Sequence, residues 1–411
     1  MENTTGWIDF VPDGWNIMNF GQVIERISTG LNPRDNFKLT KTDKRYYVTI
    51  KNFKDGKLYL DDKCDRISEN AWEVIQERSD LHKGDVLLAS ISKEGQVYLL
   101  KEEPNNWNVN ESVFCIRVNK RCMNNRYFCY EITNVRYYDD LLMDATGTTF
   151  KSIKQNNLKQ SRLLVPPLSE QQAIADYLDE TCSKIDEIIA EAKASINEYK
   201  ELKIGQINKY TIHKMKRTKL KYITEKIGDG IHATPEYSDE GIIRFINGGS
   251  FGEDSIKMIG PMLSNEEYQK QNKSLLNEHT VMIALNGANF GNTSLYNNEA
   301  ILLGKSAGYI TLKPTVCREY VRYCLENSVT KEAFDLSLNG TTIPNLSLNT
   351  LRNTEICLPD YSVQKQLAKT IKKMIIKMDS LIAEKASLIN DLEAYKKSLI
   401  YEVVTGKRRV I

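Results

Sequence analysis

Residues 147–178 read GTTFKSIKQNNLKQSRLLVPPLSEQQAIADYL, and residues 340–371 read GTTIPNLSLNTLRNTEICLPDYSVQKQLAKTI. The two stretches superimpose without a gap at an offset of 193 residues, and the match continues to residues 213 and 406. Over these 67 positions, 18 residues are identical. Self-similarity at a fixed offset indicates a tandem duplication. The chain therefore contains two copies of one structural unit.

Each copy predicts a long helix, because its apolar residues alternate in steps of three and four, the heptad seam of a coiled coil. The seam residues that we expect to pair the helices are Leu178, Ile185, Ile189 and Ile196 in the first copy and Ile371, Met378, Ile382 and Ile389 in the second. Neither stretch contains proline, so each helix can run about 42 residues, or ~63 Å. Ser169 and Gln172 form a capping-box pattern at the start of the first helix, and Gly406 is expected to end the second.

The segments between these copies match each other more weakly and mix short β-rich runs with polar turns. The predicted strands are residues 46–50, 85–90 and 112–118 in the first segment and residues 242–246, 280–285 and 309–312 in the second, with short helices at 126–135 and 318–326. We therefore expect mixed α/β globules that alternate with the two long helices.

Composition excludes several classes of protein. The 411 residues are 41% hydrophobic and 27% charged, with only 10 Pro and 22 Gly, which is typical of globular chains and not of disordered ones. No run of 18 apolar residues occurs, and residues 1–20 lack the basic head and apolar core of a signal peptide. We expect a cytoplasmic protein that neither spans a membrane nor is secreted.

The cysteine pattern and the charge balance say little about partners. None of the eight cysteines forms a CxxC pair, so we expect reduced thiols and no zinc site. The net charge of +2 neither demands nor excludes a nucleic-acid partner. Basic residues gather between Lys200 and Lys221, and again at Lys396, Lys397, Lys407, Arg408 and Arg409. Two interpretations stay open: cations that complement helix C-termini, and contacts to phosphate or to an acidic partner.

No constellation of residues points to catalysis, and we predict no catalytic, cofactor-binding or metal-binding residues. Gly304-Lys305-Ser306 resembles the end of a phosphate-binding loop, but the first glycine of that loop would be residue 299, which is Glu299. A turn at the end of a strand is the better interpretation. The glycine-rich run of residues 286–291 is interpreted as a hairpin or a ligand-facing loop. The sequence favours recognition and assembly.

Together these motifs resemble the DNA-specificity subunit of type I restriction-modification systems. The shared pattern occurs twice: Gly-Thr-Thr, a polar stretch, a leucine, an apolar strand, a proline, Ser-x-Gln and a long helix. The second module also opens with Gly228-Asp-Gly-Ile-His-Ala-Thr-Pro235, and Val404-Thr-Gly406 ends the second helix, both as in this family. The first module departs from the pattern at Ser28-Thr-Gly-Leu-Asn-Pro33.

The resemblance implies two target recognition domains, residues 1–168 and 214–361, joined by antiparallel helices with pseudo-twofold symmetry. The helices, residues 169–213 and residues 362–411 with the C-terminal tail, would act as a ruler between the halves of a bipartite double-stranded DNA target. Two methyltransferase subunits would dock on the assembly and methylate adenine with S-adenosylmethionine. Two motor-nuclease subunits that use ATP and Mg²⁺ would join where restriction occurs. The chain itself would be non-catalytic and would bind no cofactor directly.

Base-contacting residues do not follow from the resemblance, because specificity varies within the family. We predict polar side chains on loops that flank the strands, since Arg and Lys suit guanine and Asn suits adenine. These residues are Asn32, Arg34, Lys51, Asn52, Ser92, Lys93 and Thr149 in the first module and Asp229, His232, Thr234, Asn247, Asn286, Asn289 and Thr342 in the second. For each of them, a turn cap or a solvated loop residue is the alternative.

Two other functions remain as hypotheses. A protein-interaction scaffold would show no salt-dependent affinity for DNA, either alone or with a methyltransferase. A solitary enzyme of nucleic-acid metabolism would turn over substrate without partners, and the missing catalytic motifs argue against it.

Overall fold

The computed structural model describes residues 7–410 apart from residues 35, 55, 92–95, 144–151, 213–216, 253–254, 288 and 339–344. The chain forms two compact units. Unit 1 comprises residues 1–191 and 388–411, and unit 2 comprises residues 192–387. Each unit therefore contains the start of one long helix and the end of the other.

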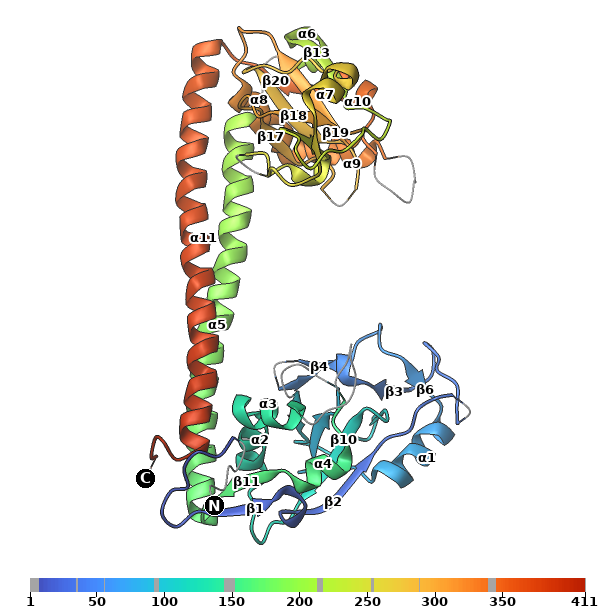
Figure 1. The fold of residues 1–411 in the computed structure, drawn as a ribbon, viewed down its shortest axis with the longest axis vertical. Coiled ribbons are helices and arrows are strands. Elements are labelled where there is room, and N and C mark those ends of the chain that lie inside the picture. The colour runs from blue at the N-terminus through green and yellow to red at the C-terminus, as the bar shows by residue number, and fades with distance from the viewer. Residues whose placement is uncertain are drawn as a thin grey trace. The chain divides into compact units, whose positions relative to one another are not determined.

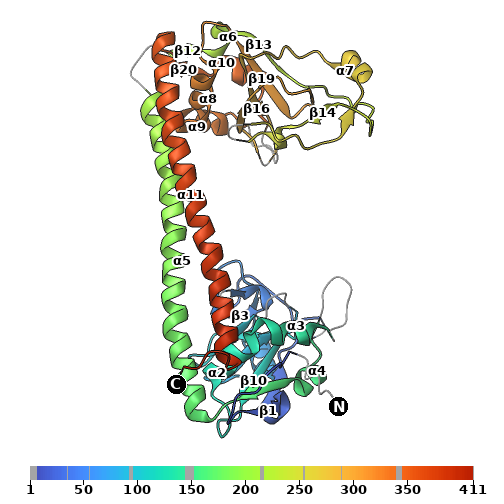
Figure 2. The ribbon, with the colours of Figure 1, turned by 60° about the vertical axis from the view of Figure 1, so that its left-hand side comes forward.

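The duplicated segments form two helices, α5 (Leu168–Thr211) and α11 (Tyr361–Val404), of 44 residues each. They run side by side in opposite directions (Figures 1 and 2). The predicted seam residues are all buried or half-buried. The expected helix pair is therefore present, with each helix two residues longer than predicted.

The capping box predicted at the start of the first helix is wrong. α5 begins at Leu168, so Ser169 lies inside the first turn and not before it. The first helical hydrogen bond runs from the amide of Gln171 to the carbonyl of Pro167, at 2.9 Å. Oε1 of Gln172 instead accepts a hydrogen bond from Nδ2 of Asn124, at 2.8 Å.

A buried glutamine fixes each helix start. The Nε2 group of Gln171 donates to the carbonyl of Pro166 at 2.8 Å, and Gln364 donates to the carbonyl of Pro359 at 2.7 Å. Oε1 of Gln171 accepts a hydrogen bond from the backbone amide of Asn124 at 2.8 Å. Oε1 of Gln364 accepts one from the backbone amide of Cys317 at 2.9 Å. Because the two glutamines occupy equivalent positions, this clamp is duplicated with the helix.

At the other end of α11, Gly406 has a φ of +68° and terminates the helix, as predicted. The tail that follows also lies in unit 1, where Arg409 pairs with Glu170 at 2.8 Å. Trp15 donates to the second oxygen of the same carboxylate at 2.9 Å. Glu170 therefore joins the N-terminal segment to the C-terminal tail within unit 1.

Unit 1 contains a four-stranded sheet in the order β2-β10-β7-β8, a three-stranded sheet in the order β6-β3-β9, and the pairs β1-β11 and β4-β5. Its strands are β1 (Asn16–Asn19), β2 (Ile24–Thr29), β3 (Arg45–Val48), β4 (Phe53–Lys54), β5 (Lys57–Leu58), β6 (Arg66–Ile67), β7 (Val86–Ala89), β8 (Val97–Leu99), β9 (Trp107–Val109), β10 (Val113–Val118) and β11 (Arg162–Val165). Its short helices are α1 (Glu69–Ser79), α2 (Asn125–Thr133), α3 (Val135–Met143) and α4 (Gln155–Gln160).

Unit 2 repeats this topology with sheets in the orders β13-β19-β16-β17 and β15-β14-β18 and the pair β12-β20. Its strands are β12 (Arg217–Lys219), β13 (Thr224–Asp229), β14 (Ile243–Ile246), β15 (Met262–Leu263), β16 (Thr280–Ala284), β17 (Thr293–Leu295), β18 (Ile301–Leu303), β19 (Ala307–Leu312) and β20 (Glu355–Cys357). Its short helices are α6 (Leu220–Ile223), α7 (Asn265–Gln271), α8 (Arg318–Glu326), α9 (Ser328–Leu336) and α10 (Leu348–Asn353). All six predicted strands and both predicted short helices overlap observed ones.

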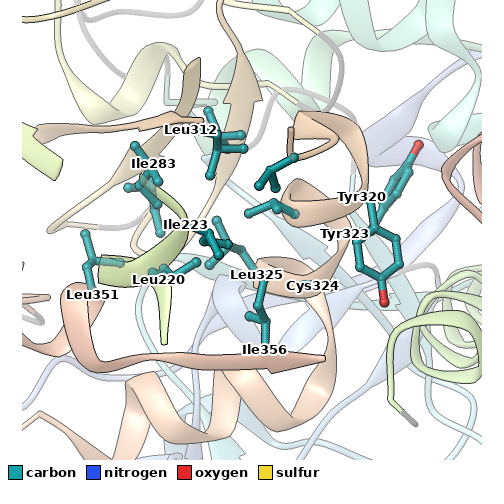
Figure 3. Close-up of a cluster of buried hydrophobic side chains, with 14 of the residues drawn as sticks. Leu220, Ile223, Ile283, Leu312, Tyr320, Tyr323, Cys324, Leu325, Leu351 and Ile356 are labelled. Atoms are coloured by element: carbon teal, nitrogen blue, oxygen red, sulfur yellow. The ribbon is translucent and has the colours of Figure 1, made fainter. Parts of the chain in front are cut away.

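The main core of unit 2 lies between the four-stranded sheet and α8. Ile283 and Leu312 from the sheet pack against Tyr320 and Leu325 from the helix, and Leu351 of α10 closes the cluster (Figure 3). All five side chains are buried. Burial of a large apolar side chain stabilises the fold by ~1.5–3 kcal/mol. The same core includes Ile207 of α5 and Ile371 of α11, so it joins the sheet to the long helices.

Unit 1 has a buried carboxyl group that unit 2 lacks at the equivalent position. Glu131 of α2 is fully buried, and its Oε1 accepts the amide of Leu164 at 2.8 Å, whereas the equivalent residue in unit 2 is Cys324. Burial raises the pKa of Glu131 from its ordinary 4.5 to about 8. Between these values the folded carboxyl is protonated and the unfolded one is ionised, so the stability of unit 1 falls as pH rises from 4.5 to 8.

We expect Glu131→Gln to stabilise unit 1 by ~2–3 kcal/mol at pH 7, and to have little effect at pH 4.5. The amide keeps an acceptor for Leu164 and cannot ionise. All four tryptophans lie in unit 1, so urea unfolding followed by tryptophan fluorescence measures this unit. An equal pH dependence in the variant and the parent would contradict a neutral buried carboxyl.

All eight cysteines are free thiols, as predicted. Among the described residues, no helix combines the length and apolar character needed to cross a bilayer. Within the same residues, no group of His, Cys, Asp and Glu side chains is placed to hold a metal ion.

Candidate nucleic-acid interface

In unit 2 the ends of four strands meet on one side of the two sheets. β13 and β16 both pair antiparallel with β19, so their last residues, Asp229 and Ala284, lie beside its start. β14 and β18 are parallel, and Ile246 pairs with Leu303 at their carboxyl ends. The turn of residues 304–306 then joins β18 to β19. We call the loops after β13, β14 and β16, together with this turn, the loop face of unit 2.

Six of the seven DNA contacts predicted for the second module lie on this loop face. Asp229, His232 and Thr234 end or follow β13, Asn247 follows β14, and Asn286 and Asn289 follow β16. Thr342 lies outside the described residues. Residues that are more than 50 positions apart in the sequence are thus gathered by the sheet topology, as a single binding surface requires.

Specific contacts order two of these loops. His232 lies 2.9 Å from the carboxylate of Asp229, which orients the exposed imidazole. The hydroxyl of Ser306 donates to Oδ1 of Asn247 at 3.0 Å and accepts the amide of Gly248 at 3.0 Å. The side chain of Asn247 is therefore fixed to the turn between β18 and β19.

Unit 1 has an equivalent loop face, formed by the loops after β2, β3 and β7 and by the turn of residues 110–112 between β9 and β10. Asn32 and Arg34 follow β2, while Lys51 and Asn52 follow β3. Arg34 and Lys51 are exposed. Ser92, Lys93 and Thr149 lie outside the described residues.

The side chain of Asn52 is engaged inside its own loop. Its Oδ1 accepts the amide of Thr49 at 2.8 Å, and its Nδ2 donates to the carbonyl of Tyr59 at 3.2 Å. These contacts favour the turn-cap alternative for Asn52. Its role in DNA binding, like that of the other predicted residues, stays a prediction.

The two loop faces have the same pattern of backbone hydrogen bonds. The amide of Asn110 donates to Val48 and that of Gly304 donates to Ile246, both at 2.9 Å. The carbonyl of Ser112 accepts a hydrogen bond from the amide of Ser90 at 2.8 Å. The carbonyl of Ser306 accepts one from the amide of Leu285 at 2.9 Å. Residues 110–112 and 304–306 are therefore structurally equivalent turns.

Residues 304–306 form a turn at the end of a strand, as predicted, but this turn was not among the predicted DNA contacts. The turn reaches the loop face through the parallel pairing of β14 with β18, which links residues 57 positions apart. No local pattern reveals such a pairing. The two turns do share a serine directly before the following strand, Ser112 and Ser306.

Two reciprocal ion pairs, which no sequence pattern predicted, hold the long helices together. Lys203 of α5 binds the carboxylate of Asp379 of α11 at 2.9 Å, and Lys396 of α11 binds Asp186 of α5 at 2.6 Å. Both lysines and both aspartates are equivalent at the 193-residue offset. The same contact is thus made twice with the roles of the helices exchanged, which is the signature of an internal twofold relation.

The contacts of the basic segments favour structural roles for several of their residues. Lys203 and Lys396 pair with the aspartates just described, Arg409 pairs with Glu170, and Lys407 lies 4.7 Å from the ring centre of Tyr401. Lys214 and Lys216 lie outside the described residues.

Comparison with known proteins agrees with this architecture. The family model for the type I restriction modification DNA specificity domain matches residues 12–198 and again residues 204–391. The chain belongs to this family. It is therefore a DNA specificity subunit with two target recognition domains, and specificity subunits are the non-catalytic components of type I systems.

Two curated relatives from Methanocaldococcus jannaschii match nearly the whole chain. The type I restriction enzyme MjaVIII specificity subunit is 22% identical, covering 97% of this chain and 94% of the relative. The putative type I restriction enzyme MjaX specificity subunit is 24% identical, covering 97% and 95%.

Solved structures share the fold of this specificity subunit. A chain from "Structural basis underlying complex assembly and conformational transition of the type I R-M system" superimposes with a TM-score of 0.75 at 16% identity, covering 96% of this chain and 98% of that one. The HsdS subunit from Thermoanaerobacter tengcongensis gives a TM-score of 0.51 at 16% identity, covering 98% and 100%. Both likenesses support the fold of two duplicated domains on paired helices.

Proposed function

We propose that residues 1–168 and 214–361 are the two target recognition domains, and that each reads one half of a bipartite double-stranded DNA target. The equivalence of the two loop faces carries this proposal. They share strand order and backbone hydrogen bonds, while the polar side chains on them differ. A common scaffold with different side chains is what two different half-sites require, because base edges are distinguished by donors and acceptors.

In this account the helix segments, residues 169–213 and 362–411, fix the gap between the half-sites. The reciprocal pairs Lys203–Asp379 and Lys396–Asp186 support this role, since they set the register of α5 against α11 at two equivalent points. The net charge of +2 is compatible with DNA binding if partner subunits supply part of the phosphate contact.

We further propose that the helices dock two copies of one methyltransferase subunit. Exposed apolar side chains recur at equivalent positions on the helices, with Leu168 matching Tyr361 and Leu202 matching Tyr395. Exposed apolar patches at duplicated positions fit two identical partners. S-adenosylmethionine would be bound by these subunits for adenine methylation. Motor-nuclease subunits, where present, would bring ATP and Mg²⁺, and the complex would act on chromosomal DNA in the cytoplasm.

Exchange of residues 216–358 for the same module of a relative tests the division of labour. We expect one half of the methylated sequence to change and the other half to stay the same, because the first recognition domain and both helices are untouched. The measurement is a methylation map of a host that expresses the chimaera with the methyltransferase. A change in both halves would contradict independent domains, and a complex without salt-dependent DNA affinity would favour the scaffold hypothesis.

A further inference from the structure

The two equivalent turns of the loop faces carry opposite charges at their centres. Residue 111 is Glu111 in unit 1, and its equivalent in unit 2 is Lys305. Both side chains are exposed, and the backbone on either side of each is fixed by the hydrogen bonds described above. One scaffold thus presents an acceptor in the first recognition domain and a donor in the second.

In unit 2 a second donor lies beside Lys305. A Cβ atom on Gly304 would overlap Oδ1 of Asn247, so glycine is needed there for the asparagine to pack against the turn. Because Ser306 donates to this Oδ1, the Nδ2 group is the atom of the amide left to make further contacts. Within the described parts of the chain, Nδ2 of Asn247 has no hydrogen-bond partner.

Asn247 also does not act as an ordinary helix cap. It precedes the short 3-10 helix Gly248–Ser250, yet its side chain makes no capping hydrogen bond there. The equivalent residue in unit 1, Thr49, forms a capping box with Asn52 and is used inside its own loop. The amide of Asn247 is therefore held in place by the turn and left available on the loop face.

In unit 1 the position of Glu111 is supported differently. The equivalent strands β3 and β14 carry Tyr47 and Phe245 at the same register position. Burial raises the pKa of Tyr47 above its usual range, and the neighbouring carboxylate of Glu111 contributes a further increase. The hydroxyl of Tyr47 donates to the carbonyl of Leu31 at 2.6 Å and is the group that faces the Glu111 carboxylate, and Phe245 has no counterpart to it.

We propose that the centre of this turn is a specificity-determining position in each recognition domain. Lys305, with the fixed Nδ2 donor of Asn247, reads the N7 and O6 acceptors of a guanine in the major groove, and Glu111 accepts from the N4 amino group of a cytosine. Guanine is the base whose major-groove edge offers two acceptors, and cytosine offers a donor. Ser306 and Gly304 are positioning residues that act through Asn247. The proposal rests on the proposed function of the two domains.

The test exchanges the charges one domain at a time. Lys305→Glu and Glu111→Lys variants are expressed with the methyltransferase subunit in a host that lacks adenine methylation, and the methylated motifs are mapped. The purified complexes are then assayed on duplex oligonucleotides that carry each of the four bases at each position of the parental motif. Matched controls are Lys313→Glu and Glu25→Lys, exposed charges at the opposite ends of β19 and β2.

We expect Lys305→Glu to lower the preference for guanine at one position of one half-site at least about tenfold, with the other half unchanged. Glu111→Lys should act in the same way on a cytosine in the opposite half, and the controls should leave the motif as it is. Asn247→Asp keeps the acceptor for Ser306 and removes the donor, so it should affect the same position as Lys305→Glu. Ser306→Ala should broaden the preference there, and Ser306→Thr should restore it.

Two results would overturn the proposal. One is a parental preference retained at every position in both charge variants. The other is a uniform loss of activity on all sequences with a smaller salt dependence, which is the behaviour of a phosphate contact. A parental complex that methylates no bipartite motif would instead contradict the function proposed for the chain, so the two failures are distinguishable.

Discussion

Insertion of seven residues after Ala194 in α5 and after Ser387 in α11 is expected to lengthen the gap by about three base pairs and to leave both half-sites unchanged. Seven helical residues add ~10.5 Å, and one base pair spans ~3.4 Å. The two insertion points are equivalent in the duplication and lie between the reciprocal ion pairs. A whole heptad keeps the seam in phase, so both ion pairs can still form.

The same seven residues inserted into α5 alone provide the control. The register of α5 against α11 would then be broken on one side of the insertion, and Lys203–Asp379 and Lys396–Asp186 could not form together. We expect this variant to lose methylation. Methylation maps of the three complexes measure both effects. An altered half-site, or an unchanged gap in the symmetric variant, would contradict the role of the helices as a ruler.

Replacement of Gln171 by leucine is expected to destabilise unit 1 by ~2–4 kcal/mol. The substitution removes the partners of the Asn124 amide and of the carbonyls of Cys122 and Pro166. Gln171 is fully buried, so water cannot replace these bonds without opening the helix start. Tryptophan fluorescence during urea unfolding measures the effect.

The duplication supplies matched controls for this prediction. Gln364→Leu removes the equivalent clamp in unit 2, and it should leave the tryptophan signal of unit 1 unchanged while hydrogen exchange increases at the start of α8. Gln172→Leu changes an exposed neighbour and should cost less than ~1 kcal/mol. Equal stability of the Gln171→Leu and Gln172→Leu variants would show that the clamp does not hold the helix.

Features that depend on local periodicity could be predicted from the sequence. The heptad spacing from Leu178 to Ile196 and from Ile371 to Ile389 predicted the helix pair, because one buried stripe needs one partner. β-rich runs such as residues 112–118 predicted strands that are present. The capping box at Ser169 was wrong because a buried tertiary partner, Gln171, determines where the helix begins.

Features that join distant residues could not be predicted in this way. The loop face of unit 2 brings Asn247 next to Ser306, 59 positions further along the chain, through a parallel strand pair. The ion pairs between α5 and α11 span more than 170 positions. The alignment of the repeats contains both aspartates and both lysines as identical residues, but the pairing of each lysine with its aspartate follows only from the antiparallel helices.

In the proposed function, this chain selects a bipartite DNA sequence for adenine methylation. The most direct measurement is a genome-wide methylation map of the source strain with and without the gene. We expect deletion to abolish methylation of one motif with two separated halves and to leave other methylated motifs unchanged. A bipartite motif that persists at full occupancy after deletion, or a map in which the gene makes no difference, would contradict the claim.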